Sequence, residues 1–318
     1  MFCSYIIPTI GRTSLTRAVM SVLEQAPAQA DFEVIVVNDS GEPLPQASWH
    51  QSPRVQILNT NQVERSYARN AGAAVARGSY LAFLDDDDWI LPGAIEAFYH
   101  LANQEPEALW LYGGIRIVNE RAESLAELNS GLSGYCAAQV MGGAWAPLQA
   151  SLIRADAFGL SGGFSPLVCG TEDEDLCRRI AYQGRFANTP TTVACLYRGQ
   201  LWTTSTNYLR APEDTKYSRN LVLAMPNAFR RLWASADSSY WYGRIVRVYL
   251  SAISWNLQHK RLFAALSRAF YAAAALWLSI PYFSSPQYWQ GIKAHHAPGA
   301  LHFVMQDYER RQSPVHRV

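Results

Sequence analysis

Two runs of carboxylates are the residues of this sequence best suited to chemistry. The first acidic run, Asp85–Asp88, follows the apolar stretch 80–84, and the second acidic run, Glu172–Asp175, opens a segment with helical spacing. Carboxylates this close raise one another's pKa unless a cation offsets them, and a hard divalent metal is one such cation. The first run therefore predicts a metal site, and the metal in turn suggests a substrate that carries phosphate.

Each run also has a simpler interpretation. Runs of like charge are often solvated loops, and acidic residues in the first turn of a helix are stabilised by the helix dipole. The strand character of 80–84 favours a site for the first acidic run, because ligands of α/β sheets gather at the carboxyl ends of the strands.

The N-terminal half alternates between strand and helix patterns. We expect strands at 4–7, 33–37, 54–58 and 80–84, and helices at 15–25 and 66–76. The run EVIVV lacks polar alternation, which is typical of a strand buried on both faces. This order predicts a parallel sheet with its polar loops along one edge, where a nucleotide could bind.

The second half is less regular. Strands are expected at 108–112 and 114–118, whereas 130–147 is rich in Gly, Ala and Ser and is interpreted as a mobile loop. The stretch 150–186 predicts a strand, a Gly-Gly turn and a helix. From about residue 211 the chain is expected to be mostly helical, with one apolar face made of Leu262, Phe263, Leu266 and Phe270.

Composition limits the class of protein. A chain of 318 residues with 49% hydrophobic residues can bury a large core, and a net charge of +1 argues against a nucleic-acid partner. The 5 Cys include no CxxC pair, so neither a disulfide framework nor a zinc site is expected. An N-terminal apolar run broken by Pro8 is not typical of a signal peptide, and we expect a cytoplasmic protein.

Charge is unevenly distributed along the chain. From residue 238 onward Asp307 and Glu309 stand against nine basic residues: Arg244, Arg247, Lys260, Arg261, Arg268, Lys293, Arg310, Arg311 and Arg317. The remainder of the chain is net acidic. We therefore expect two regions: a domain at 1–210 whose acidic character suits metal-dependent catalysis, and a basic, mostly helical region at 211–318.

Several motifs in order resemble the inverting glycosyltransferases of the GT-A family 2 type. They are YIIPTIGR, EVIVVND, ARNAGAAVARGSYLAFLDDDDW, SGGF and GTEDEDLCRR, and the resemblance covers residues 1 to about 205. Each motif alone is weak, but their order and spacing are specific. The resemblance implies an α/β fold with a GT-A, Rossmann-like, mostly parallel sheet flanked by helices, followed by a helical C-terminal region.

The resemblance also implies substrates and residue roles. A sugar would pass from a nucleotide diphosphate, with UDP expected, to a hydroxyl of a glycan or lipid-linked acceptor. The residues expected to bind the nucleotide sugar are Pro8, Thr9, Arg12, Asp39, Arg69, Asp85 and Asp86. Asp87, the last residue of the DxD motif, would ligate Mg²⁺ or Mn²⁺, which acts as a Lewis acid toward the departing diphosphate.

The catalytic pair implied by the resemblance is Glu172 and Asp173, with Asp173 as the base. Its place at a helix N-terminus would keep it ionised near neutral pH. Chemistry alone leaves Asp175 as an alternative base. By resemblance, the SGGF residues 162–164 would shape the acceptor side.

The sequence departs from the family pattern in two places. Gln200 stands where many relatives carry a His that helps to hold the metal or diphosphate, and an amide cannot replace an imidazole equivalently. Asn38 and Asp39 stand in place of an acidic pair, which is a milder change.

Other interpretations stay open. A catalytically silent nucleotide-sugar or glycan-binding module would be expected to lose the carboxylates, and a metal-dependent nucleotidyltransferase would be expected to carry a lysine in its N-terminal loop, which PTIGRTSLTR lacks. The C-terminal helices are expected to pack on the catalytic domain, or alternatively to lie peripherally on the inner, anionic membrane surface. The run AFYAAAALWLSIPYF is too short and too interrupted by Pro to predict a membrane span.

Overall fold

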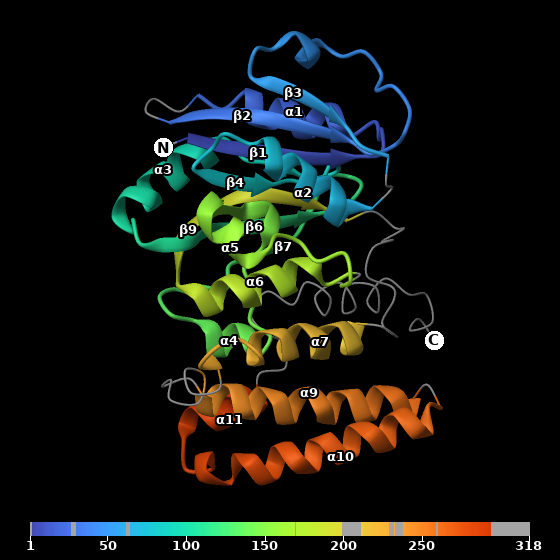
Figure 1. The fold of residues 1–318 in the computed structure, drawn as a ribbon, viewed down its shortest axis with the longest axis vertical. Helices are drawn as coiled ribbons and strands as arrows, with labels where there is room; N and C mark the ends of the chain where they lie inside the picture. Colours follow the sequence, from blue (N-terminus) through green and yellow to red (C-terminus); the bar gives the residue numbers. More distant parts are fainter. Residues whose placement is uncertain are drawn as a thin grey trace. The chain divides into compact units, whose positions relative to one another are not determined.

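The computed structural model describes residues 2–26, 30–61, 64–168, 170–198, 211–228, 232, 238–258 and 260–293. The chain forms two compact units. The sheet unit comprises residues 1–135 and 146–221, and the helical unit comprises residues 136–145 and 222–318. Figure 1 shows the strands in the first and the long helices α9 and α10 in the second.

The first half of the sheet is parallel, as the sequence predicts. The strands run in the order β3-β2-β1-β4, with bounds β1 Phe2–Thr9, β2 Asp31–Asn38, β3 Val55–Asn59 and β4 Tyr80–Phe83. The connecting helices are α1, Leu15–Leu23, and α2, Arg65–Val75. Strand β2 is buried on both faces after Asp31, which confirms the prediction for EVIVV.

Helix α2 lies unusually close to the sheet. A Cβ at Gly72 would lie 2.5 Å from the side chain of Ile6 and 2.9 Å from that of Val37. Only a residue without a side chain fits between the helix and these two strands. The small residues of α2 therefore set the depth at which Arg69, on the same helix, meets the strand ends.

Beyond β4 the sheet is mixed. Strands β6 and β9 pair in parallel, while β8, β5 and β7 pair antiparallel with their neighbours. Their bounds are β5 Trp89–Ile90, β6 Ala108–Val118, β7 Ser124–Leu128, β8 Ser151–Arg154 and β9 Arg185–Tyr197. The two strands predicted at 108–112 and 114–118 are one strand, because Gly113 and Gly114 are absorbed as register shifts against β9.

Helices flank this sheet, and the predicted α/β fold class is confirmed. They are α3 Ala94–Gln104, α5 Ala155–Ser161 and α6 Glu172–Gln183, with 3-10 turns at Ser48–Gln51 and Leu148–Ala150. Helix α6 begins at Glu172, so the second acidic run forms its first turn, as predicted. Helix α7 spans Ala211–Leu223.

The helical unit includes a segment that the sequence assigned to a mobile loop. Within 130–147 the chain forms helix α4, Ala137–Met141, and most of the segment is buried. The Arg244 Nε donates to the carbonyl of Gly142 at 3.0 Å, which ties this segment to helix α9. The loop prediction is therefore wrong. A helix of five residues, AAQVM, is too short to show an apolar period.

The described part of the helical unit also contains α9 Ser238–Gln258, α10 Leu262–Ser279, the 3-10 turn η3 Ile280–Tyr282 and α11 Pro286–Lys293. Helices α9 and α11 cross at two glycines. A Cβ at Gly243 would lie 2.1 Å from the carbonyl oxygen of Tyr288, and one at Gly291 would lie 2.3 Å from that of Tyr240. Any larger side chain at either position would push these helices apart.

Candidate functional site

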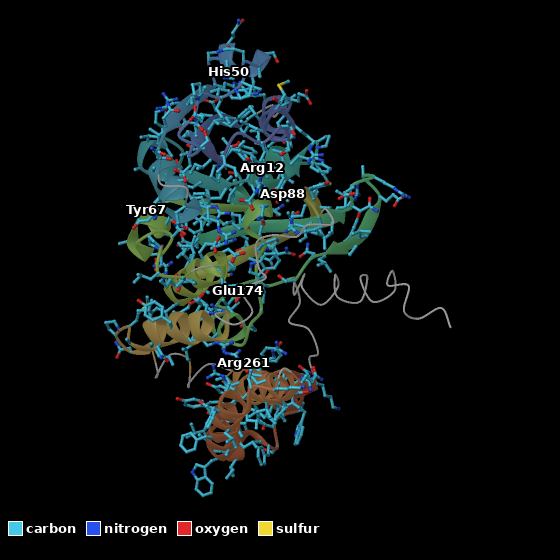
Figure 2. All side chains as sticks on the ribbon, turned by 90° about the vertical axis from the view of Figure 1, so that its right-hand side faces the viewer. Arg12, His50, Tyr67, Asp88, Glu174 and Arg261 are labelled. Carbon is cyan, nitrogen blue, oxygen red and sulfur yellow. The ribbon has the colours of Figure 1, made fainter. Side chains whose placement is uncertain are left out.

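The loops that follow β1, β2 and β4 meet at one edge of the sheet, as predicted. The Thr9 hydroxyl donates to Asp86 at 2.6 Å, and the backbone N–H of Asp39 donates to the Thr9 carbonyl at 2.8 Å. Arg12 Nη1 donates to both Asp86 and Asp87 at 3.0 Å. Pro8, in β1, pairs in register with Val37 of β2 just before these loops begin. Figure 2 shows Arg12 and Asp88 close together in this region.

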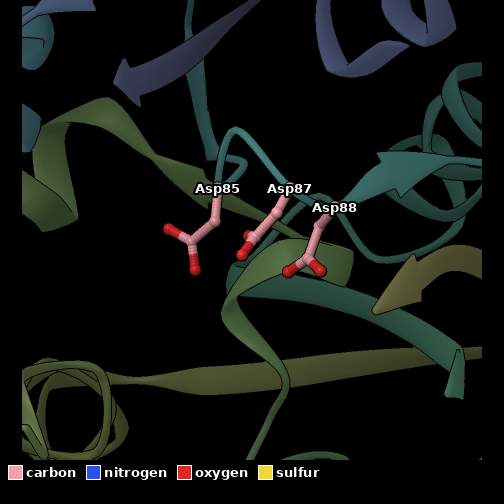
Figure 3. Close-up of side chains that lie close together, drawn as sticks. All are labelled: Asp85, Asp87 and Asp88. Carbon is pink, nitrogen blue, oxygen red and sulfur yellow. The ribbon is translucent and has the colours of Figure 1, made fainter. Parts of the chain in front are cut away.

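The first acidic run is not a solvated loop. Asp86 is 4% exposed and Asp88 is fully buried, whereas about a third of the side chains of Asp85 and Asp87 is exposed, at 31% and 33%. The carboxylates of Asp85, Asp87 and Asp88 point to the same side of the turn (Figure 3), and each offers an oxygen within 4.8 Å of the others. This spacing suits a hard divalent cation.

The pKa values within the turn diverge. Burial would raise the pKa of Asp85, but the charge and hydrogen bond of Arg69 outweigh it and lower that pKa to about 2. Burial and the charge of Asp85 raise the pKa of Asp87 despite Arg12. Burial raises the pKa of Asp88 well above its usual range, even though Arg198 lies 3.7 Å away. The neighbouring arginines therefore leave part of the negative charge of the turn uncompensated.

The hydrogen bonding of the Asp88 carboxylate indicates whether a metal ion fits this turn. Its Oδ1 accepts from the backbone N–H of Tyr197 at 2.8 Å, while its buried Oδ2 has no hydrogen-bond partner within the described part of the chain. A buried carboxylate oxygen without a partner is costly, and a bound cation would lower the raised pKa values of Asp87 and Asp88. The residues present thus fit Mg²⁺ or Mn²⁺, with Asp85 and Asp88 beside the predicted ligand Asp87.

Arg69 joins the two acidic runs. Its Nη2 donates to Asp85 at 2.6 Å and its Nη1 donates to Glu172 at 2.9 Å. The side chain is 3% exposed. Burial would lower its pKa, but the charges of the two carboxylates raise it further above its usual value. Arg69 is therefore a permanently charged link inside the site and not a surface arginine.

Asp173 is the titratable group of the second run. Glu172 is held by Arg69 and also by Arg65 Nε at 2.8 Å, whereas Asp173 forms no ion pair with any described residue. Burial, and then the charges of Glu172 and Glu174, raise the pKa of Asp173 to about 7. The expectation that the helix N-terminus keeps it ionised near neutral pH is not met, because burial and the charges of Glu172 and Glu174 raise its pKa into that range.

Asp175, the alternative base, has a different environment. It is fully buried, and its Oδ2 accepts from Arg179 Nε at 3.0 Å and from Arg179 Nη2 at 2.6 Å. A carboxylate bound in this way has no path to an acceptor hydroxyl. The geometry favours Asp173 as the base.

Asp39 anchors the loop before α2. Its two oxygens accept from the Thr60 hydroxyl and from the backbone N–H of Glu64, both at 2.7 Å, and the residue is 3% exposed. A nucleobase N–H would have to use a remaining lone pair. Its predicted contact with the nucleotide stays a prediction.

The SGGF motif is hydrogen-bonded to helix α2. Asn70 donates to the Phe164 carbonyl at 2.8 Å and accepts from the Phe164 N–H at 2.9 Å. Gly163 has φ +69°, and a Cβ there would lie 2.6 Å from Asn70 Oδ1. Phe164 is 1% exposed and packs against Phe83 and Phe158. Phe164 can therefore influence an acceptor only through the position of α2.

Four site residues were missed from the sequence: Arg17, Arg65, Gln149 and Arg198. Arg65 precedes Arg69 by four positions on one helix, a spacing that places both on the same face. Arg17 lies 3.9 Å from the ring centre of Trp89 and donates to the Asp87 carbonyl at 2.7 Å. Gln149 donates to Asp85 at 2.9 Å and carries no sequence signal. The predicted departure at Gln200 lies outside the described residues.

Comparisons with known proteins agree with this geometry. The sequence profile described as Glycosyl transferase family 2 matches residues 4–130, which run from within β1 to just past β7 and include the whole first acidic run. An uncharacterised glycosyltransferase of Haemophilus influenzae is 27% identical over 221 residues, which is 65% of this chain and 74% of that protein. The poly(ribitol-phosphate) beta-N-acetylglucosaminyltransferase TarP of Staphylococcus aureus is 32% identical over 107 residues, 32% of this chain and 33% of TarP.

Solved structures show the same fold. The structure of S. aureus TarS 1-349 in complex with UDP-GlcNAc has a TM-score of 0.56 and 13% identity, and the match covers 84% of this chain and 90% of that one. The same fragment in complex with UDP has a TM-score of 0.52 and covers 92% of this chain. Sequence profile, relatives and fold together support a glycosyltransferase: residues 4–130 match glycosyl transferase family 2, and the chain has the GT-A type of fold.

Proposed function

We propose that this glycosyltransferase moves a sugar from a nucleotide diphosphate, with UDP as the nucleotide, to a hydroxyl of a glycan or lipid-linked acceptor, with inversion at the anomeric carbon. The observation that carries the proposal is Arg69, which holds Asp85 and Glu172 on opposite sides of one guanidinium. It brings a candidate metal turn next to a carboxylate, Asp173, whose pKa is about 7. The UDP and UDP-GlcNAc complexes of TarS support a uridine nucleotide donor on this fold.

The donor would lie along the edge where the loops after β1, β2 and β4 meet. Pro8, Thr9 and Asp39 line this edge as candidates for the nucleoside. Arg12 already contacts the first acidic run and is 42% exposed, so it can turn toward a diphosphate. Asp87, with Asp85 and Asp88, would hold Mg²⁺ or Mn²⁺, which when bound supplies Lewis acidity that stabilises the departing diphosphate.

The proton of the acceptor hydroxyl passes to Asp173. As that oxygen forms its bond to the anomeric carbon, the bond from this carbon to the diphosphate breaks on the opposite face, which inverts the configuration. A base is most effective when its pKa lies near the working pH, and a pKa of about 7 meets that condition. Glu172 does not share this role, because its carboxylate is already engaged by both Arg65 and Arg69.

The proposal is tested by donor turnover. Purified protein is incubated with UDP-GlcNAc, other UDP-sugars or GDP-mannose, with Mn²⁺ and then with EDTA, and release of the nucleotide is measured. We expect metal-dependent release of UDP that Asp173→Asn abolishes while donor binding is retained. A matched control is Glu127→Gln, an exposed carboxylate that pairs with Arg116 on β6, away from both acidic runs.

The outcomes are distinct. Release of UDP that is lost in Asp173→Asn and kept in Glu127→Gln supports the proposal. Binding of donor without turnover by the wild type would indicate a catalytically silent module. Equal turnover by the wild type and Asp173→Asn would reject Asp173 as the base. A product whose anomeric configuration matches the donor, read by proton NMR, would reject inversion.

A further inference from the structure

Helix α10 reverses the usual pattern of a surface helix, in which large apolar residues are buried and polar residues face the solvent. Its buried positions are small: Ala265, Ala272, Ala275 and Ser279. Its outward positions are large and apolar, with exposed fractions of 63% for Leu262, 91% for Phe263, 67% for Leu266, 72% for Phe270 and 75% for Trp277. Exposed apolar patches of this kind mark surfaces that meet another apolar phase.

These outward residues form one continuous face. The positions 262, 266, 270, 273, 277 and 280 are separated by three or four residues, so they lie in line along the helix. The face continues past the end of α10 to Phe283 and Trp289, which are 42% and 46% exposed. We call the apolar residues Leu262, Phe263, Leu266, Phe270, Trp277, Ile280, Phe283 and Trp289 the α10 face.

The charge around the α10 face has one sign. No Asp or Glu occurs in the sequence between Ser238 and Lys293, whereas five Arg and Lys residues that are not buried do: Arg247, Lys260, Arg261, Arg268 and Lys293. Lys260 and Arg261 are exposed at the start of α10, and Lys293 is exposed at the end of α11. Cationic residues around a row of Leu, Phe and Trp are complementary to an anionic lipid surface, where the apolar side chains enter the acyl boundary and the cations meet the headgroups.

We propose that the α10 face lies on the surface of an anionic lipid bilayer. The segment Leu262–Tyr282 is the one segment among the described residues that is, by length and composition, long and apolar enough to cross a membrane. The opposite side of α10 packs on α9, where Tyr271 stacks on Tyr249 at 5.6 Å. A helix with one side already packed in protein suits a position in the plane of the interface. This inference does not rest on the proposed function.

The test is co-sedimentation of the full chain with vesicles of phosphatidylcholine alone or mixed with phosphatidylglycerol. The variant Phe263→Ser with Phe270→Ser removes two exposed rings and leaves the packed side of α10 intact. The matched control is Leu160→Ser with Leu167→Ser, which removes two leucines that are 82% and 69% exposed in the sheet unit. Circular dichroism and donor turnover show whether each variant is folded.

We expect the wild type to bind the anionic vesicles and to be released at about 0.5 M salt, where charge attraction is screened. The α10 variant should bind at least about tenfold more weakly, since it loses two rings that would enter the bilayer, and the control variant should bind like the wild type. The inference is overturned if the wild type binds neither vesicle, or if the α10 variant binds as well as the control.

Two further results would overturn it in favour of another role for α10. If wild-type protein resists release from vesicles by alkaline carbonate, the helix spans the bilayer. If light scattering shows that the wild type is an oligomer and the α10 variant a monomer, and neither binds vesicles, a second copy of the chain covers the α10 face.

Discussion

The guanidinium of Arg69 donates to the carboxylate of Glu172 at 2.9 Å, although the two residues are 103 positions apart in the chain. The other terminal nitrogen of Arg69 holds Asp85 at 2.6 Å. One buried cation therefore fixes the distance between the turn that can hold a metal and the first turn of the helix that carries Asp173. This link depends on α2 lying close to the sheet, which Gly72 permits.

Replacement of Arg69 should damage the fold as well as the site. Arg69→Met leaves Glu172 buried and Asp85 without its strongest partner, and removal of one member of a buried ion pair costs about 3–5 kcal/mol. Arg65→Met removes a cation that is 34% exposed and leaves Arg69 on Glu172, so it should cost less than about 1 kcal/mol. Urea unfolding measures both. Equal losses would show that Arg69 is not the central link.

The transferase activity should fall at acidic pH, because Asp173 must be ionised to accept a proton. Its pKa of about 7 predicts that kcat/KM declines as the pH falls through about 7. Glu174→Gln removes a neighbouring negative charge that raises this pKa, so it should move the acid limb of the profile to lower pH. A limb that stays in place in Glu174→Gln would mean that another group controls it.

Asp173→Asn should stabilise the protein at alkaline pH. The pKa of Asp173 is raised on folding, so its contribution to the free energy of unfolding is present at low pH and is lost as the pH rises toward 7 and above. Asn is neutral at all these pH values and avoids that loss. Thermal unfolding should therefore give a higher Tm for Asp173→Asn at pH about 8, and the difference should shrink as the pH falls to about 4, near the ordinary pKa of Asp. A lower Tm at the higher pH would contradict the raised pKa.

Asp175 should matter for folding and not for proton transfer. Asp175→Asn leaves Arg179 buried with a weaker partner, and this should lower the free energy of unfolding by about 3 kcal/mol or more. The fraction that remains folded should keep its kcat and its pH profile. A loss of kcat without a loss of stability would instead favour Asp175 as the base.

The sequence predicted the parallel half of the sheet and the meeting of its loops. Apolar runs such as EVIVV and the alternation of strands with helices carry that information locally. Because parallel strands end at the same edge, the contact of Thr9 and Arg12 with the first acidic run followed from topology alone.

The rest of the fold and of the site depends on contacts between residues far apart in the chain, which no local sequence pattern indicates. Helix α4 has only five residues, too few to show a helical period, and β6 continues through two glycines, where a strand pattern predicts an interruption. Gln149 reaches Asp85 across 64 positions of sequence. The raised pKa of Asp173 follows from burial and from two neighbouring carboxylates, whereas the helix dipole that is readable from the sequence acts in the opposite direction.

The most direct test of the account is calorimetric titration of UDP into the wild type and into Asp87→Ala, with Mn²⁺ and then with EDTA. We predict that the wild type binds UDP with Mn²⁺ and loses most of this affinity in EDTA, and that Asp87→Ala binds equally weakly under both conditions. Binding that is the same with and without metal, or unchanged in Asp87→Ala, would contradict a metal-held diphosphate at the first acidic run.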